Sequence, residues 1–123
     1  MTLEEKKKQY QQMLVQEYRS SNPEETENLT DAEVALMNPI TDYEFTFLIG
    51  NELNSINREI VELMEDIKHC EDRMNTPGIH YQEVTDCRSD IVYDERKLAE
   101  LRQQFDTLKK VLLERKTEDE RSR

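Results

Sequence analysis

The feature that most constrains this chain is a heptad rhythm of apolar residues in its central and C-terminal parts. Apolar side chains recur at spacings that alternate between four and three residues over 49–74, and the rhythm resumes over 84–112. Each run aligns its side chains along one stripe of a helix, and two such stripes pack together. The Thr-Pro-Gly sequence at 76–78 breaks the helix between the runs. We therefore predict an all-α fold built on an antiparallel two-helix coiled-coil hairpin, at about residues 42–75 and 80–116.

Two registers satisfy this rhythm. A tight register centres the turn on residues 77–78 and places Ile60 opposite Asp94. A register shifted by one heptad pairs Met74 with Cys87 instead and lengthens the loop. We prefer the tight register, because short connections are commoner between antiparallel helices.

Capping patterns divide the first 40 residues into short helices. One apolar stripe predicts a helix from residue 3 to about residue 20, and residues 22–25 favour one further helical turn. Residues 30–33 form a capping box ahead of a short helix that must end before Pro39. Residues 41–44 form a second capping box, which opens the first long helix.

The apolar residues near the start of the first long helix exceed what a two-helix seam can cover. Phe45, Phe47 and Leu48 all cluster there. We therefore expect residues 1–40 to form a small helical head packed at the open end of the hairpin. The whole chain, 1–123, is then a single all-helical domain with a head at 1–40, a hairpin at 41–116 and a frayed tail at 117–123, because the tail has no apolar residue.

Charge is unevenly distributed along the chain. The formal net charge is −11, and residues 17–94 are strongly acidic, whereas residues 95–116 are net basic. An acidic surface repels the phosphate backbone of nucleic acids, so we expect no direct nucleic-acid binding. A protein partner with a basic surface would suit it better.

Signals for a cellular compartment are few. Two cysteines cannot build a disulfide framework, and no N-terminal apolar stretch resembles a signal peptide. No run approaches the roughly 20 apolar residues of a membrane span. We expect a cytoplasmic protein that does not enter a membrane.

Two residue groups resemble metal ligands in type but not in spacing. The first lies near the turn and contains no Cys-x-x-Cys or His-x3-His pattern: His69, Cys70, His80 and Cys87. A disulfide between its two cysteines stays open, although both already fit as small seam residues. The second resembles the carboxylate-rich helices of di-metal bundles but lacks their Glu-x-x-His pairs: Glu62, Glu65, Asp66, Asp90 and Asp94. A solvated acidic face explains the second group better, so we expect no metal.

No catalytic pattern can be assembled from this sequence. It has no Gly-rich phosphate loop, no nucleophile elbow and no Ser/His/Asp arrangement. We therefore expect neither an enzyme nor a cofactor.

The turn end of the hairpin combines aromatic and acidic residues. Tyrosine is favoured at protein interfaces, because it buries a large area at a low entropy cost. Asp94 is the one polar residue of the seam, and it either fixes the register, turns sideways to a base such as Arg58, or contacts a partner. The candidate partner-binding residues are Tyr81, Glu83, Asp86, Asp90, Tyr93 and Asp94.

These features favour a non-enzymatic, acidic protein–protein interaction module. In size and charge alone, the chain resembles phage-encoded inhibitors of host defence or nucleic-acid enzymes. Some inhibitors of that kind present carboxylates where their target expects phosphates. The alternative is a structural component that forms a homo-oligomeric helical bundle, for instance a homodimer, through the off-seam side chains of Val61 and Met64.

Overall fold

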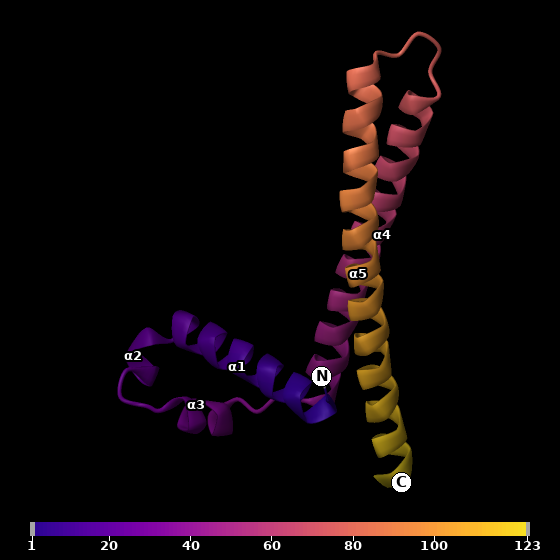
Figure 1. Cartoon of the computed structure of the whole chain (residues 1–123). Helices are drawn as coiled ribbons and strands as arrows, with labels where there is room; N and C mark the ends of the chain where they lie inside the picture. Colours follow the sequence, from indigo (N-terminus) through magenta and orange to yellow (C-terminus); the bar gives the residue numbers. More distant parts are fainter. Residues whose placement is uncertain (1, 123) are drawn as a thin grey trace. The chain divides into compact units, whose positions relative to one another are not determined.

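The computed structural model describes residues 2–122, with side chains described as far as Thr117. Within that range the chain forms helices only, and the two longest pack closely as a hairpin, which confirms the predicted all-α fold. In chain order the helices in Figure 1 are α1 (Leu3–Ser21), α2 (Pro23–Thr26), α3 (Asp31–Met37), α4 (Asp42–Met74) and α5 (Tyr81–Ser122).

The helices form two compact units. The head unit comprises Met1–Asn51 and Leu108–Arg123, and the arm unit comprises Glu52–Thr107. The head unit therefore takes in more chain than the predicted head at 1–40, since it also contains the start of α4 and the end of α5. Both of these segments supply buried side chains to it, including Phe45, Ile49 and Val111.

Reciprocal capping boxes begin the helices of the head unit where the sequence predicts them. The N–H of Glu33 donates to Oγ1 of Thr30 at 3.2 Å, and the Thr30 N–H donates to Oε1 of Glu33 at 3.3 Å. At the start of α4, Thr41 and Glu44 exchange the same two bonds at 3.0 and 3.3 Å. Each box satisfies backbone donors that an uncapped helix would leave unpaired.

The aromatic rings of Tyr10 and Phe45 join α1 to α4 at the core of the head unit. Their centroids lie 5.5 Å apart with the planes at 63°, an edge-to-face arrangement. Both side chains are 1% exposed, and Val34 of α3 is fully buried. The predicted docking of the N-terminal helices on the start of α4 is confirmed.

Several apolar side chains of the head unit stay outside this core. α3 has only seven residues, so a single face of two turns points inward, and Leu36 and Met37 are 82% and 55% exposed. Phe47, predicted to be covered, is 57% exposed and stacks on Tyr43 with centroids 6.5 Å apart. Of the three residues predicted to need covering, Phe45 is buried and Leu48 half-buried.

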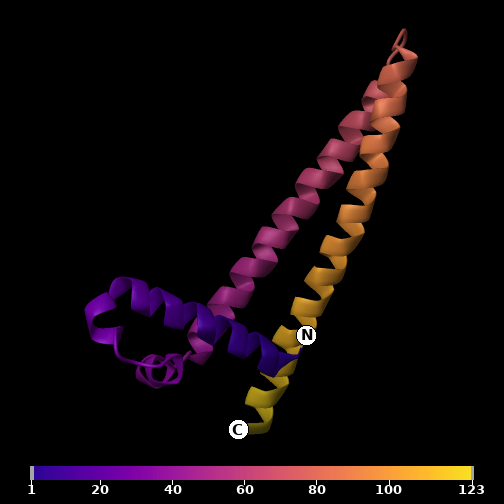
Figure 2. The same cartoon turned by 60° about the vertical axis from the view of Figure 1, so that its left-hand side comes forward.

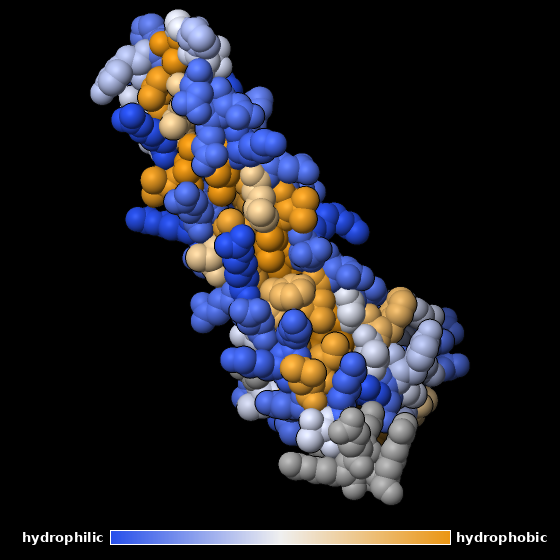
Figure 3. Space-filling view, turned by 90° about the vertical axis from the view of Figure 1, so that its right-hand side faces the viewer, coloured by the Kyte–Doolittle hydropathy of each residue, from blue (hydrophilic) through white to orange (hydrophobic). Residues whose placement is uncertain are grey.

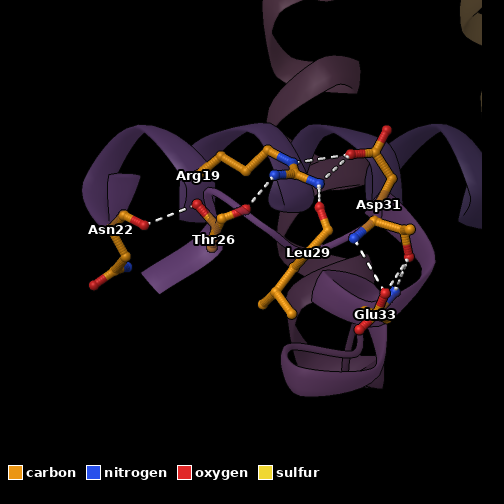
Figure 4. Close-up of polar contacts among 7 residues, drawn as sticks. Arg19, Asn22, Thr26, Leu29, Asp31 and Glu33 are labelled. Carbon is orange, nitrogen blue, oxygen red and sulfur yellow. Dashed lines mark hydrogen bonds and ion pairs between the residues drawn. The ribbon is translucent and has the colours of Figure 1, made fainter. Parts of the chain in front are cut away.

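Arg19 closes the loop between α2 and α3 (Figure 4). Its Nη1 donates to the carbonyl of Thr26 at 2.9 Å and its Nη2 to the carbonyl of Leu29 at 2.7 Å. Its Nε donates to Oδ1 of Asp31 at 2.9 Å. One planar guanidinium thus holds two backbone carbonyls and a carboxylate, a geometry that fits its fixed fork of donors.

The heptad rhythm of the arm unit is borne out residue by residue. Every predicted seam position of α4 from Leu53 to Met74 and of α5 from Val84 to Phe105 is buried or half-buried. Every other residue of those two stretches is exposed. Figures 1 and 2 show the two helices of the arm unit side by side from two directions. The hairpin therefore buries one stripe of each helix and leaves the rest to solvent.

The preferred tight register is wrong, and the shifted register holds. Nη2 of Arg102 lies 3.9 Å from Sδ of Met64. The tight register would separate these two residues by about 18 Å along the helix axes, whereas the shifted register separates them by about 8 Å, within reach of two long side chains. The shifted register places Met74 opposite Cys87 and Ile67, not Ile60, opposite Asp94.

The loop between α4 and α5 is short although the two helices pair in the shifted register. α4 ends at Met74 and α5 begins at Tyr81, so both helices extend almost to the break. Gly78 takes the left-handed conformation there, with φ of 81°, which a side chain would disfavour. Backbone bonds from Thr76 to Arg73 and from Ile79 to Thr76 close the turn.

The C-terminal helix ends later than predicted. α5 continues to Ser122 instead of ending near Lys116. No Gly or Pro follows Lys116 to stop it, and charged residues such as Glu and Arg are good helix formers even without an apolar face. The predicted fraying of 117–123 stays a prediction, and Arg123 lies outside the described residues.

Candidate interaction surfaces

Five of the six predicted partner-binding residues share one side of α5. Glu83, Asp86, Asp90 and Tyr93 follow one another at spacings of three or four residues, so they line neighbouring turns of one helix face. Asp94 borders this face at the seam. The structure thus brings together the acidic residues and one tyrosine of the predicted set.

Tyr81 lies elsewhere. At about 100° per residue it points about half a turn away from Asp90, toward the other side of the arm unit. It is 79% exposed, and Tyr93 is 66% exposed. Helical periodicity thus turns Tyr81 away from the acidic residues, and its part in partner binding stays a prediction.

The antiparallel pairing adds acidic residues of α4 to those predicted on α5. Positions next to the seam on the same side as Asp90 face one another across an antiparallel pair. On α4 these positions and their outer neighbours are Glu59, Glu62 and Asp66, and all three are exposed. We call the combined surface the acidic face: Glu59, Glu62, Asp66, Glu83, Asp86 and Asp90. The heptad positions of the α4 residues were a usable signal for it, because both registers place them on the side of Asp90.

Few bonds within the chain neutralise the acidic face. Nη2 of Arg73 approaches Oε2 of Glu83 at 3.5 Å, with both side chains about half exposed. Asp86 accepts a bond from Nε2 of Gln82 at 3.2 Å. Asp90 forms no ion pair with any side chain described between residues 2 and 117. Most carboxylates of the face are thus open to a partner.

Asp94 occupies the seam as predicted and is half-buried. The register puts it beside Ile67 and near Cys70. It forms no hydrogen bond or ion pair within the described part of the chain, so the predicted sideways bond to Arg58 is absent there. A half-buried carboxylate without a hydrogen bond or an ion pair lowers the stability of the seam at this position.

Cys70 and Cys87 are both free thiols and lie close together in the seam. Burial raises the pKa of Cys70, and the neighbouring Cys87 thiol and the carboxylates of Asp90 and Asp94 raise it further. A raised pKa keeps the thiol neutral and a poor metal ligand, since metals bind the thiolate. Among the described residues, no three His, Cys, Asp or Glu side chains are grouped to hold a metal ion.

An apolar groove runs along the opposite side of the arm unit. Its volume is about 430 Å³, and its floor consists of Met64, Ile67, Leu98 and Ala99. Its rim carries Lys68 and Glu71 from α4 and Glu95 and Arg102 from α5. In Figure 3, apolar side chains form a band along the paired helices, flanked by polar ones. Met64 was predictable as an off-seam apolar residue, whereas the groove exists only where the two helices meet.

The head unit has two hollows on its surface. One, of about 600 Å³, lies between the start of α1 and the end of α5 and is lined by residues such as Leu3, Lys110 and Leu113. The other, of about 420 Å³, lies beside Gln11 and Ile40. Neither is lined by His, Cys or Ser. That the chain is not an enzyme stays a prediction.

Comparison of the chain with protein-family models, with characterised proteins and with solved structures found no match. No helix within residues 2–122 has a stretch long and apolar enough to cross a lipid bilayer.

Proposed function

We propose that this protein is a non-enzymatic interaction module whose acidic face binds a basic surface on another protein. The observation that supports the proposal is the gathering of six exposed carboxylates from α4 and α5 on one side of the arm unit. Tyr93 lies within the same face and is 66% exposed. An aromatic anchor inside a charged surface is typical of protein interfaces.

The charge of the arm unit supports the same proposal. Residues 52–107 contain 14 Asp and Glu against seven Lys and Arg. Such a surface attracts basic partners over a distance of about 8 Å at physiological salt, and the attraction raises the rate of association. Electrostatic attraction alone provides no apolar contact in the bound complex, and Tyr93 would supply one.

The finer form of the proposal is a phage-type inhibitor that mimics nucleic acid. Glu83, Asp86 and Asp90 place a carboxylate every 4.5 to 6 Å or so along α5. A protein that binds phosphate backbones carries Lys and Arg that would accept these carboxylates instead. The two free thiols are compatible with action in a reducing cytoplasm.

Binding to a fluorescent oligolysine peptide tests where the basic partner docks. The triple variant Glu83→Ala, Asp86→Ala, Asp90→Ala should weaken binding by about tenfold or more, and raised salt should weaken binding of the native chain. The matched control is Glu65→Ala, Asp72→Ala, Asp106→Ala, which removes the same charge from exposed positions off the acidic face. Equal binding by the two triple variants would contradict the acidic face as the docking site.

A competition experiment tests the mimicry. Proteins captured from a cell extract by the native chain should be released by duplex DNA or RNA, and the acidic-face triple variant should not capture them. Captured proteins that neither nucleic acid releases would contradict mimicry while leaving a basic protein partner in place.

A further inference from the structure

The apolar groove of the arm unit is a surface that the proposed function does not use. It lies on the opposite side from the acidic face, and its apolar surface extends beyond its own lining. Met64 is 50% exposed, and its neighbours at the next outward positions, Val61 and Val92, are 45% and 52% exposed. Large apolar side chains gathered on one face, and rimmed by charge, mark a contact surface.

The charges on the rim of the groove are balanced, unlike those of the arm unit as a whole. Lys68 and Arg102 stand against Glu71 and Glu95. None of these four forms an ion pair with another side chain described in the chain. Glu71 and Glu95 are like charges that line the same groove from the two helices. Lys68 and Glu95, and likewise Glu71 and Arg88, lie at nearly the same level of the arm unit but form no ion pair with any described side chain.

We propose that the groove is the contact surface of a homodimer, in which a second copy of the arm unit packs face to face and parallel to the first. The two-fold axis then runs along the arm, and α4 of each copy lies over α5 of the other. This arrangement brings Lys68 level with Glu95 of the second copy, within about 3 Å along the axis. It also brings Glu71 within about 3 Å, along the axis, of the level of Arg88 of the second copy. By symmetry each pair forms twice.

The charge pattern selects this arrangement over its antiparallel counterpart. With the arms antiparallel, α5 of one copy would lie over α5 of the other, and Glu95 would approach Glu95 of the second copy at the centre of the groove. Like charges placed opposite each other across an interface oppose association. The parallel arrangement instead sets Lys68 against Glu95 and Glu71 against Arg88 of the second copy.

The face is large enough for a stable contact. The arm unit spans Glu52–Met74 of α4, about 35 Å of helix, and two adjacent helices are about 20 Å wide. A contact along this face would bury on the order of 1,200 Å² or more in total, the lower end of the range for specific protein interfaces. Four packed helices would also bury the half-exposed seam more fully than two can.

Analytical ultracentrifugation of the whole chain at about 10 µM tests the dimer. The native chain should sediment as a dimer. Lys68→Glu and Glu95→Lys should each weaken dimerisation by about tenfold or more, because each sets like charges together twice. The double variant, with both substitutions, restores the opposite charges and should return the dissociation constant to near its native value.

Two control variants test whether the effect is specific to the groove. Glu62→Lys makes the same charge change on the acidic face and should leave dimerisation intact, whereas Ala99→Glu puts a charge at the centre of the groove and should abolish it. Circular dichroism reports whether each variant folds. A monomeric native chain at about 100 µM would overturn the proposal. So would single charge variants that dimerise as well as the native chain. Binding of oligolysine by the acidic face does not enter this measurement, so the two proposals fail separately.

Discussion

Sδ of Met64 and Nη2 of Arg102 lie 3.9 Å apart across the arm unit, although 38 residues separate them in the sequence. This contact determines the pairing of α4 with α5, because the tight register would separate the two residues by about 18 Å along the helix axes and the shifted register by only about 8 Å. It places Asp94 opposite Ile67. The levels at which the surface side chains of the two helices meet follow from this pairing.

Replacing Asp94 by Leu should stabilise the protein. Asp94 is half-buried in the seam with no bonding partner among the described residues, so Asp94→Leu exchanges a poorly solvated carboxylate for an apolar contact. The expected gain in the free energy of unfolding is about 1–2 kcal/mol. Urea denaturation followed by circular dichroism measures it. A loss of stability would mean that the carboxylate is held by a bond that the seam needs.

The same substitution reports the register through a double-mutant cycle. In the observed register Ile67 faces Asp94, whereas the tight register would put Ile60 there. The gain from Asp94→Leu should therefore shrink in an Ile67→Ala background and persist in an Ile60→Ala background, because only residues in contact couple. Coupling to Ile60 instead would contradict the register.

Truncating Phe45 should unfold the head unit more readily. Its ring is 1% exposed and packs edge-to-face on Tyr10, so Phe45→Ala should cost about 3–5 kcal/mol, the usual range for a buried Phe. Phe47→Ala is the matched control, because its ring is 57% exposed, and it should cost less than about 1 kcal/mol. Hydrogen exchange of the α1 amides locates the loss, and similar effects of the two variants would contradict the described core.

Arg19→Lys should loosen the loop between α2 and α3. The lysine keeps the charge but cannot serve two carbonyls and a carboxylate with one fixed fork of donors, so we expect a cost of about 1–2 kcal/mol. Arg58→Lys, at an exposed position of α4, should change stability by less than about 0.5 kcal/mol. The measurement is amide exchange across residues 22–30. Equal protection in both variants would show that the Arg19 bonds do not hold the loop.

Cys70 should resist alkylation at mildly alkaline pH. Its pKa is raised above the ordinary 9.0, first by burial, so little thiolate is present at about pH 8. Iodoacetamide should modify it more slowly than it modifies the unfolded chain, and Cys87→Ala should speed the reaction by removing one cause of the raised pKa. Mass spectrometry of a tryptic digest identifies the modified cysteine. Native and unfolded chains that react equally fast would contradict the prediction.

The same pKa shift has a consequence for stability. A thiol whose pKa is raised by folding contributes its full stabilisation below the ordinary pKa and loses it as pH rises through the folded value. The free energy of unfolding should therefore fall above pH 9, and Cys70→Ala should flatten that fall. Denaturant titrations across the alkaline range check the difference between the two slopes.

The sequence by itself determined the helices and the residues that face inward. Alternating spacings of four and three have one structural meaning, because only a helix of 3.6 residues per turn brings such positions onto one stripe. Thr30 and Thr41 likewise fix the starts of α3 and α4, since a capping box satisfies its donors within four residues. Both signals are local, so no tertiary structure was needed to interpret them.

Only the tertiary structure decided at which level the two long helices pair. Both registers bury the same stripes, so periodicity cannot distinguish them, and the preference for a short loop chose wrongly. Heptad periodicity places Glu62 and Asp66 on the side of Asp90 in either register and turns Tyr81 away from it, whereas the pairing forms the groove at Met64 and Leu98. A groove between two helices depends on the level at which they meet, and that level is a relation between distant residues.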